Sequence, residues 1–86
     1  MQERIHEDVS VITVYDHTKR RVLPWRLKWH GRTYTITQIG LHYTLSEGST
    51  LYHLFSVSDG SMFFRLKLNT QTLHWRLEEV SDGNVL

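Results

Sequence analysis

Residues 51–77 have the sequence LYHLFSVSDGSMFFRLKLNTQTLHWRL, and this stretch decides the fold class. Apolar and polar side chains alternate along most of it, which is the period of a half-buried β-strand. Asp59-Gly60 is a strong hairpin dipeptide, and a second turn is expected around Thr70-Gln71. Two-residue turns at these places predict three antiparallel strands with one shared apolar face. The members of that face are Phe55, Phe64, Leu66 and Trp75.

The other face of the same stretch is basic. With the turns above, Arg65 lies directly across from Arg76, and Lys67 lies across from His74. Like charges that face each other across a β-ladder destabilise it by roughly 0.2–1 kcal/mol per pair. A bound anion would relieve that repulsion, so the pattern indicates a surface that could hold phosphate groups.

A second hairpin is predicted around His30-Gly31, because glycine takes a positive φ at little cost. This turn pairs Leu27 with Tyr34 on an apolar face. Arg26 and Lys28 then lie on the polar face of the hairpin, where they extend the basic surface.

Further along the chain, the apolar positions change from even to odd numbers beside Gly40. A one-residue change of phase next to a glycine predicts a β-bulge or a sharp bend. We therefore expect residues 1–86 to form a single all-β domain: five to six antiparallel strands in meander order, in a strongly curled sheet or a small barrel. The expected core spans residues 9–80. We expect less order in residues 1–8, as a turn of helix or disordered chain, and in residues 81–86.

Length and composition narrow the class of protein. A chain of 86 residues supports one compact core, and 40% hydrophobic residues are too many for a disordered segment. The chain has no cysteine, which excludes a disulfide scaffold and a thiolate zinc site. No apolar run is long enough for a membrane span, so we expect a cytoplasmic protein without a membrane partner.

Catalytic and metal-binding patterns are missing from the sequence. There is no nucleophile elbow and no glycine-rich phosphate loop. The six histidines have none of the spacings of common metal sites, and His53 is expected to be a hydrogen-bonded core histidine. The predicted protein is therefore not an enzyme and uses no metal or cofactor.

The stretch LPWRLKWHGRTYTI, at residues 23–36, resembles the start of a family of small bacterial all-β domains of unknown function. The closing segment LHWRLE, at residues 73–78, is similar to the final strand of that family, so the resemblance spans roughly residues 22–80. The matched positions are Pro24, Trp29, Gly31, Arg32, Tyr34 and Ile36. Such domains also occur appended to proteins related to translesion DNA polymerases, and the resemblance therefore implies a nucleic-acid context and no catalytic residues.

Charge and aromatic residues together favour a binding module. Residues 17–76 carry nine Lys and Arg against two acidic residues, between two acidic ends. Basic side chains among exposed aromatic ones on a sheet are typical of proteins that bind single-stranded DNA or RNA. The predicted contacts are Arg26, Lys28, Tyr52, Phe63, Arg65, Lys67, His74 and Arg76.

Two other interpretations remain open for the same residues. The basic side chains can simply keep an exposed sheet in solution, with Glu78 and Glu79 close enough to neutralise them. Alternatively, Tyr52, Leu54 and Phe63 form an apolar patch. That patch would be covered within the chain, or would bind a protein partner or a second copy in a homodimer.

Overall fold

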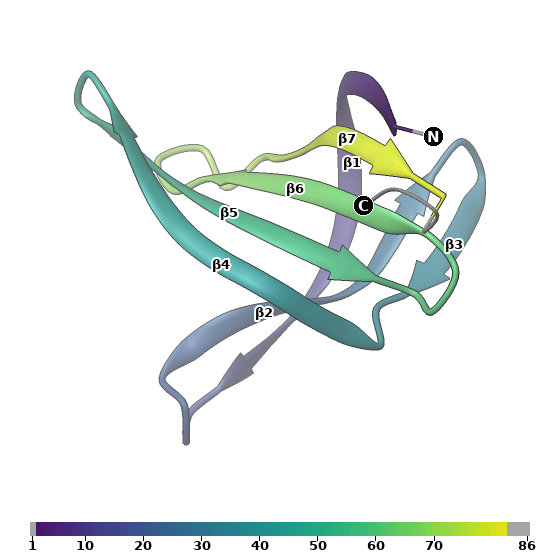
Figure 1. The fold of residues 1–86 in the computed structure, drawn as a ribbon. Coiled ribbons are helices and arrows are strands. Elements are labelled where there is room, and N and C mark those ends of the chain that lie inside the picture. Colours follow the sequence, from purple (N-terminus) through teal and green to yellow (C-terminus); the bar gives the residue numbers. More distant parts are fainter. Residues whose placement is uncertain (1, 83–86) are drawn as a thin grey trace.

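The computed structural model describes residues 2–82, which form one antiparallel sheet and no helix (Figure 1). The strands are β1 (Gln2–Asp16), β2 (Arg21–Trp29), β3 (Arg32–Thr35), β4 (Gln38–Glu47), β5 (Thr50–Ser58), β6 (Phe63–Asn69) and β7 (Trp75–Ser81). Within this part of the chain, no helix has the length and apolar character needed to cross a membrane. The predicted all-β, antiparallel class is confirmed.

The seven strands follow the order β3-β2-β1-β7-β6-β5-β4 across the sheet. Two meanders, β1–β3 and β4–β7, are thus joined by the pairing of β1 with β7. The expectation of five to six strands was too low because the chain changes partners between Ile36 and Thr37. The amide of Ile36 donates to the carbonyl of Trp25 at 2.8 Å, whereas that of Thr37 donates to the carbonyl of Ser58 at 2.8 Å.

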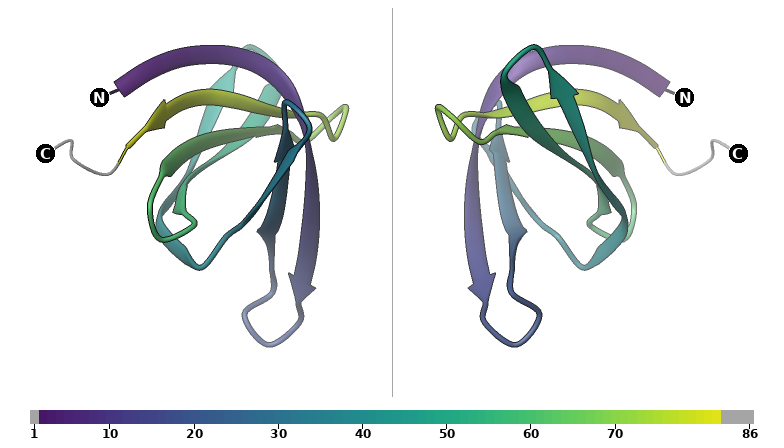
Figure 2. Two further views of the ribbon diagram at one scale, coloured as in Figure 1. Left: turned by 90° about the vertical axis from the view of Figure 1, so that its right-hand side faces the viewer. Right: turned by 90° about the vertical axis from the view of Figure 1, so that its left-hand side faces the viewer.

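The sheet is strongly curled, but it does not close into a barrel. Its two edges, β3 and β4, are consecutive in the chain but do not pair with each other. Figure 2 shows that the β1–β2 hairpin extends away from the β4–β7 meander as a separate arm.

The N-terminal segment differs from the prediction. Residues 2–8 are neither helical nor disordered but form the first half of β1, where residues 2–9 pair with β7. A bulge lies between Arg4 and Glu7, and His6 within it has a φ of 55°. Pairing with the free edge of β7 gives this polar segment its strand conformation, which its own sequence pattern does not indicate. Residues 83–86, which belong to the predicted less ordered tail, lie outside the described residues.

The concave side of the sheet contains the core. Phe55 and Phe64 are 1% and 2% exposed, and Leu66 and Trp75 are buried with them, so the predicted apolar face is confirmed. Burying side chains of this size stabilises the fold by roughly 1.5–3 kcal/mol each. The other buried members of the cluster are Leu27, Ile36, Val57, Leu77 and Val80.

The β2–β3 hairpin has the predicted register, with Leu27 paired to Tyr34. His30 and Gly31 have φ values of 51° and 76°. Two consecutive positive φ angles define the type I′ turn, whose twist matches that of the flanking strands. The predicted irregularity beside Gly40 is also confirmed, because the pairing of β4 with β5 shifts between Ile39 and Leu41.

The loops at either end of β6 are longer than predicted. Val57 pairs with Phe64 instead of Met62, because residues 59–62 form a four-residue loop. The Oδ1 atom of Asp59 accepts the amide of Met62 at 2.8 Å and that of Ser61 at 2.9 Å. Burial alone would raise the pKa of Asp59, but these donated hydrogen bonds outweigh it and lower the pKa.

The second loop has the same effect on the register. Leu68 pairs with Trp75 instead of Leu73, because residues 70–73 and not only 70–71 form the loop. The β5–β6 register is therefore wrong by two residues, and the β6–β7 register is wrong by two as far as Leu66 and by three beyond a bulge between Arg65 and Leu66. Since side chains alternate with a period of two, the even shift leaves the predicted apolar face buried, with Phe55, Phe64, Leu66 and Trp75 as its members.

Candidate functional site

The eight predicted contact residues are spread over three regions of the sheet. Four of them line one hollow of about 440 Å³, together with Asp8 and Glu78. These four are Tyr52, Lys67, His74 and Arg76. The hollow is therefore lined by charges of both signs.

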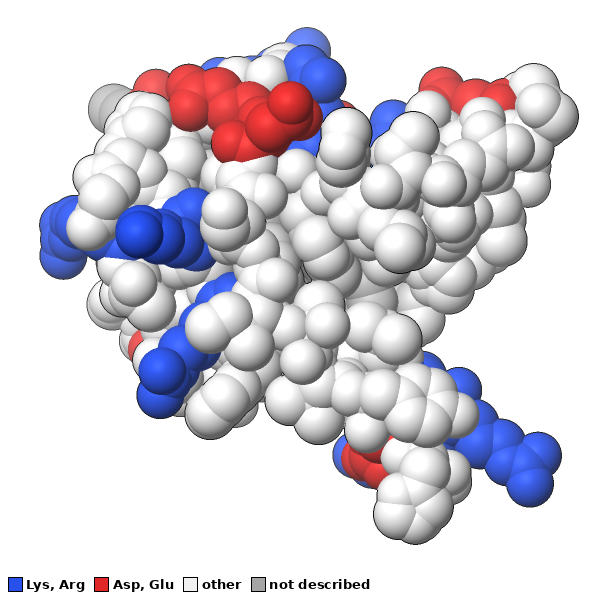
Figure 3. Space-filling view, turned by 180° about the vertical axis from the view of Figure 1, so that it is seen from behind, with Lys and Arg blue, Asp and Glu red and all other residues white. Residues whose placement is uncertain are grey.

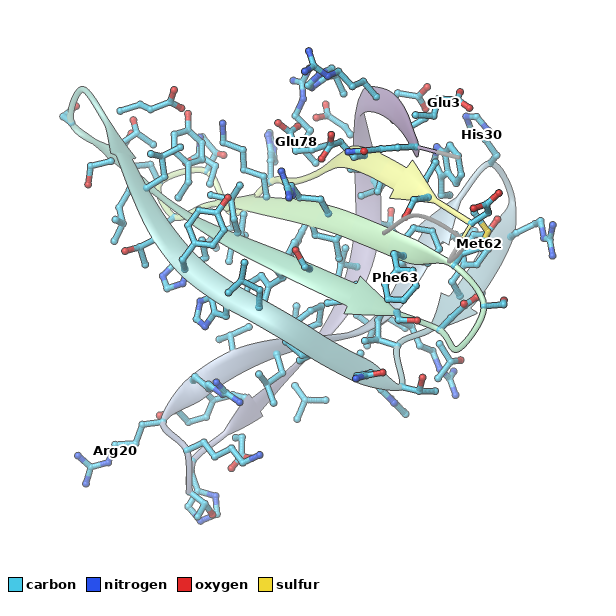
Figure 4. The ribbon with its side chains drawn as sticks, in the orientation of Figure 1. Glu3, Arg20, His30, Met62, Phe63 and Glu78 are labelled. Carbon is cyan, nitrogen blue, oxygen red and sulfur yellow. The ribbon has the colours of Figure 1, made fainter. Side chains whose placement is uncertain are left out.

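Phe63 lines a different hollow near the β5–β6 loop, and Arg65 lines both this hollow and another that it shares with Lys67. Figure 4 shows Phe63 at this end, away from Glu78. Arg26 and Lys28 lie on β2, on the other side of β1 from these two regions. The structure therefore does not unite the eight residues into one site.

The predicted opposition of Arg65 and Arg76 is wrong. Because the loop is longer, Lys67 lies across from Arg76, and a bulge between Arg65 and Leu66 then places Arg65 across from Glu79. His74, predicted to face Lys67 on a strand, precedes β7. One pair of like charges remains on the ladder, but it is not the predicted pair.

Each cation of β6 and β7 has a glutamate partner. The Arg65 guanidinium lies 3.1 Å from the carboxylate of Glu79, and the Arg76 Nε atom lies 3.2 Å from that of Glu78. The Lys67 ammonium lies 3.2 Å from the Glu47 carboxylate. Glutamates from β4 and β7 thus offset the positive charge of this face.

The three residues of the apolar patch predicted on the same face differ in how far they are exposed. Leu54 is only 7% exposed and so is buried within the chain, whereas Phe63 is 48% exposed. Tyr52 is half-buried beneath Lys67, whose ammonium lies 4.2 Å from the centre of the tyrosine ring. These three residues therefore do not form a continuous exposed surface.

The cations without carboxylate partners lie in residues 17–46, away from β6 and β7. Residues 17–46 contain six Lys and Arg and no Asp or Glu. Within residues 2–82, none of these six forms an ion pair within 4 Å. They are Lys19, Arg20, Arg21, Arg26, Lys28 and Arg32.

The unpaired cations lie on the turn before β2, on β2 itself and at the start of β3. Figure 3 shows basic side chains over β2 and β3 and at the tip of the β1–β2 hairpin, whereas acidic ones gather over the first half of β1. Arg20 points away from the rest of the molecule at the tip (Figure 4). Asp16 also lies at this hairpin, where its Oδ1 atom accepts the amides of Thr18 and Lys19 at 3.0 and 3.2 Å.

A hollow of about 440 Å³ lies beside this basic strand, between the β1–β2 hairpin and the start of β4. This volume is within the range of sites that bind small molecules. The Nε atom of Arg21 is buried and has no hydrogen-bond partner within the described chain. The hollow is lined by Val14, Lys19, Arg21, Leu23, Pro24, Trp25, Ile36, Thr37, Gln38 and Ile39.

Trp25 is 44% exposed at this hollow, and the Arg26 guanidinium lies 4.5 Å from the centre of its ring. A bulge causes this exposure. Thr13 pairs with Pro24 and Ile12 pairs with Arg26, which leaves Trp25 without a partner in β1. A large aromatic ring is thereby placed at the surface between cationic side chains.

Two histidines form a hydrogen-bonded pair elsewhere on the sheet. The Nε2 atom of His42 lies 2.7 Å from Nδ1 of His53, and the His42 ring stacks on Phe55 with the centroids 4.2 Å apart. Burial lowers the pKa of His42, and the neighbouring His53 and Arg21 lower it further. His53 is hydrogen-bonded as predicted, but it is half-buried and does not belong to the core. Among residues 2–82, no group of three or more His, Asp or Glu side chains could hold a metal ion.

Comparisons with protein-family models, curated proteins and solved structures found no match for this chain. The resemblance to the small bacterial domain family therefore stays a prediction. The sequence did contain a signal for the unpaired cations, because thirty consecutive residues, 17–46, lack a carboxylate. Lys19, Arg21 and Trp25 were missed as contacts because the bulge and the curl of the sheet place them beside the hollow.

Proposed function

We propose that this protein is a non-enzymatic module that binds single-stranded nucleic acid through a basic surface on β2. This β2 surface consists of Lys19, Arg20, Arg21, Trp25, Arg26 and Lys28. The observation that carries the proposal is the absence of ion-pair partners for its five cations within residues 2–82. Cations that are already free of carboxylates can contact phosphates without first breaking an ion pair.

The chemistry of the β2 surface suits an unpaired strand. Phosphate contacts release condensed counterions, which gives an affinity that falls steeply with salt concentration. Trp25 offers a face for base stacking, a contact worth about 1–3 kcal/mol per base. Arg21 lines the hollow beside Trp25, where its positive charge would attract a phosphate group.

In this proposal, the predicted contacts on β6 and β7 contribute less to binding than the β2 surface does. A phosphate that approached Arg65 or Arg76 would have to compete with Glu79 or Glu78. Arg26 and Lys28 remain central, as the sequence predicts. Because the chain lacks cysteine and requires no oxidising compartment, we place this function in the cytoplasm.

The proposal is tested by fluorescence anisotropy with short labelled single-stranded DNA and RNA over a range of salt concentrations. The wild-type chain should bind at about 50 mM salt and lose affinity as salt rises. The variant R26S/K28S should make the slope of log affinity against log salt shallower by about 1.4, at roughly 0.7 per phosphate contact. Trp25→Ala should weaken binding with little change in that slope.

R65S/R76S is the matched control, because it removes the same amount of positive charge. Its slope should stay close to that of the wild type, since both arginines are paired with glutamates. Equal losses in the two double variants would show that only net charge matters and would refute the assignment to β2. A wild-type chain that fails to bind at the lowest salt concentration would refute nucleic-acid binding itself.

A further inference from the structure

The edge strand β4 has no neighbour beyond β5 in the described part of the chain. Its bulge lies at the beginning, beside Gly40, and the pairing with β5 then runs without interruption from Leu41 to Glu47. Natural edge strands are commonly protected from further pairing by lysine, proline or a bulge. Residues 41–46 contain none of these, so their outward N–H and C=O groups can pair with another strand.

The outer face of β4 is apolar. Leu41, Tyr43 and Leu45 are 52%, 40% and 39% exposed, and they lie across from outer-face residues of β5. Residues 38–46 carry no charged side chain.

We infer that β4 pairs with β4 of a second copy of this chain, in antiparallel orientation, to make a homodimer with one continuous sheet. A two-fold axis at Tyr43 places the two Tyr43 rings opposite each other and sets Leu41 of each copy against Leu45 of the other. All of these side chains stay on the same face of the joined sheet, as antiparallel pairing requires.

Charge favours a second copy as the occupant of this edge. Pairing two identical strands brings like charges together wherever the strand is charged, and such contacts destabilise a ladder. Residues 38–46 avoid this penalty, and the formal net charge of the whole chain is only +1. The dimer uses β4 and leaves the β2 surface open, so it does not depend on the proposed nucleic-acid function.

The oligomeric state of the full chain tests this inference, measured by light scattering with size-exclusion chromatography from low micromolar to near-millimolar concentration. The wild-type chain should reach the mass of two copies. Tyr43→Lys places two ammonium groups opposite each other at the axis and removes the ring contact, which should raise the dissociation constant roughly tenfold or more. Tyr15→Lys is the control, since Tyr15 is also an exposed strand tyrosine but lies on β1. A wild-type chain that stays monomeric, or a dimer that survives Tyr43→Lys, overturns the inference.

Cross-linking tests the register without relying on a destabilised variant. The chain has no cysteine, so a single introduced thiol reports only on its own position. Across an antiparallel pair, facing Cα atoms lie about 4.5–5.5 Å apart, within the range of a disulfide. Tyr43→Cys should form a covalent dimer under mild oxidation, and Tyr15→Cys should not. Equal cross-linking of the two variants, or none at Tyr43→Cys, would contradict pairing through β4.

Discussion

Replacing Phe55 by leucine should destabilise the fold more than the same replacement of Phe64. The two side chains are buried to the same extent, at 1% and 2% exposure. They differ in their aromatic neighbours. Phe55 stacks on His42 with the centroids 4.2 Å apart and contacts Trp75 at 5.6 Å, with the His53 ring farther away at 6.4 Å, whereas Phe64 contacts Tyr34 alone, at 5.0 Å.

The difference can be worked out from these contacts. An aromatic pair contributes about 0.5–1.5 kcal/mol beyond the area it buries, and without the more distant His53 ring at 6.4 Å, Phe55 has one pair more than Phe64. The loss of volume is the same in both variants, so it cancels. Phe55→Leu should therefore be the less stable variant by about 0.5–1.5 kcal/mol, which corresponds to a Tm lower by roughly 2–12 °C for a chain of this size.

Urea unfolding followed by tryptophan fluorescence gives both free energies of unfolding. The chain as a whole is expected to be stable by about 4–13 kcal/mol, so both variants should still fold. The measurement is best made well above pH 6.5, where the lowered pKa of His42 keeps its ring neutral. Equal losses, or a larger loss for Phe64→Leu, would show that ring stacking at Phe55 does not stabilise this core.

Two further predictions concern the histidine pair and the type I′ turn. Because the pKa of His42 is lower in the folded chain than its ordinary 6.5, the unfolded chain takes up the proton first, and stability should fall as the pH drops below about 6.5. Urea midpoints on either side of that pH should show this loss, and His42→Phe should flatten it; an unchanged slope in the variant would assign the effect to other groups. Gly31→Ala should cost about 1–2 kcal/mol in thermal unfolding because φ at this position is 76°. Gly40→Ala should cost less, since its φ is not positive and the added Cβ would meet the Ser56 carbonyl at an ordinary 3.6 Å, and a greater loss at Gly40 would contradict this account of the turn.

The sequence predicts the faces of the strands well. Phe55, Phe64 and Trp75 lie on the buried side as expected, although the pairing of their strands is shifted by two residues. Alternation is a local property of extended backbone, so it survives any even change in loop length. The turn at His30-Gly31 was equally predictable, because its backbone angles depend on those two residues.

The ion pairs could not be predicted in the same way. An even shift leaves faces unchanged but moves every cross-strand partner, and a bulge between Arg65 and Leu66 adds one residue more, so Arg65 meets Glu79 instead of Arg76. The length of each loop depends on side-chain hydrogen bonds such as those of Asp59, which a dipeptide pattern does not contain. Because the cross-strand partners changed, the cations of the predicted basic face lie beside glutamates.

The all-β class, the alternation of the strands and the run of cations in residues 17–46 all follow from the order of the amino acids. Only the tertiary structure decides that residues 2–8 become a strand, that Trp25 reaches the surface and that β4 is left as an open edge. These features arise from pairing between segments far apart in the chain. Such pairing depends on which backbone edges remain free once the sheet has curled, and no local pattern of side chains contains that information.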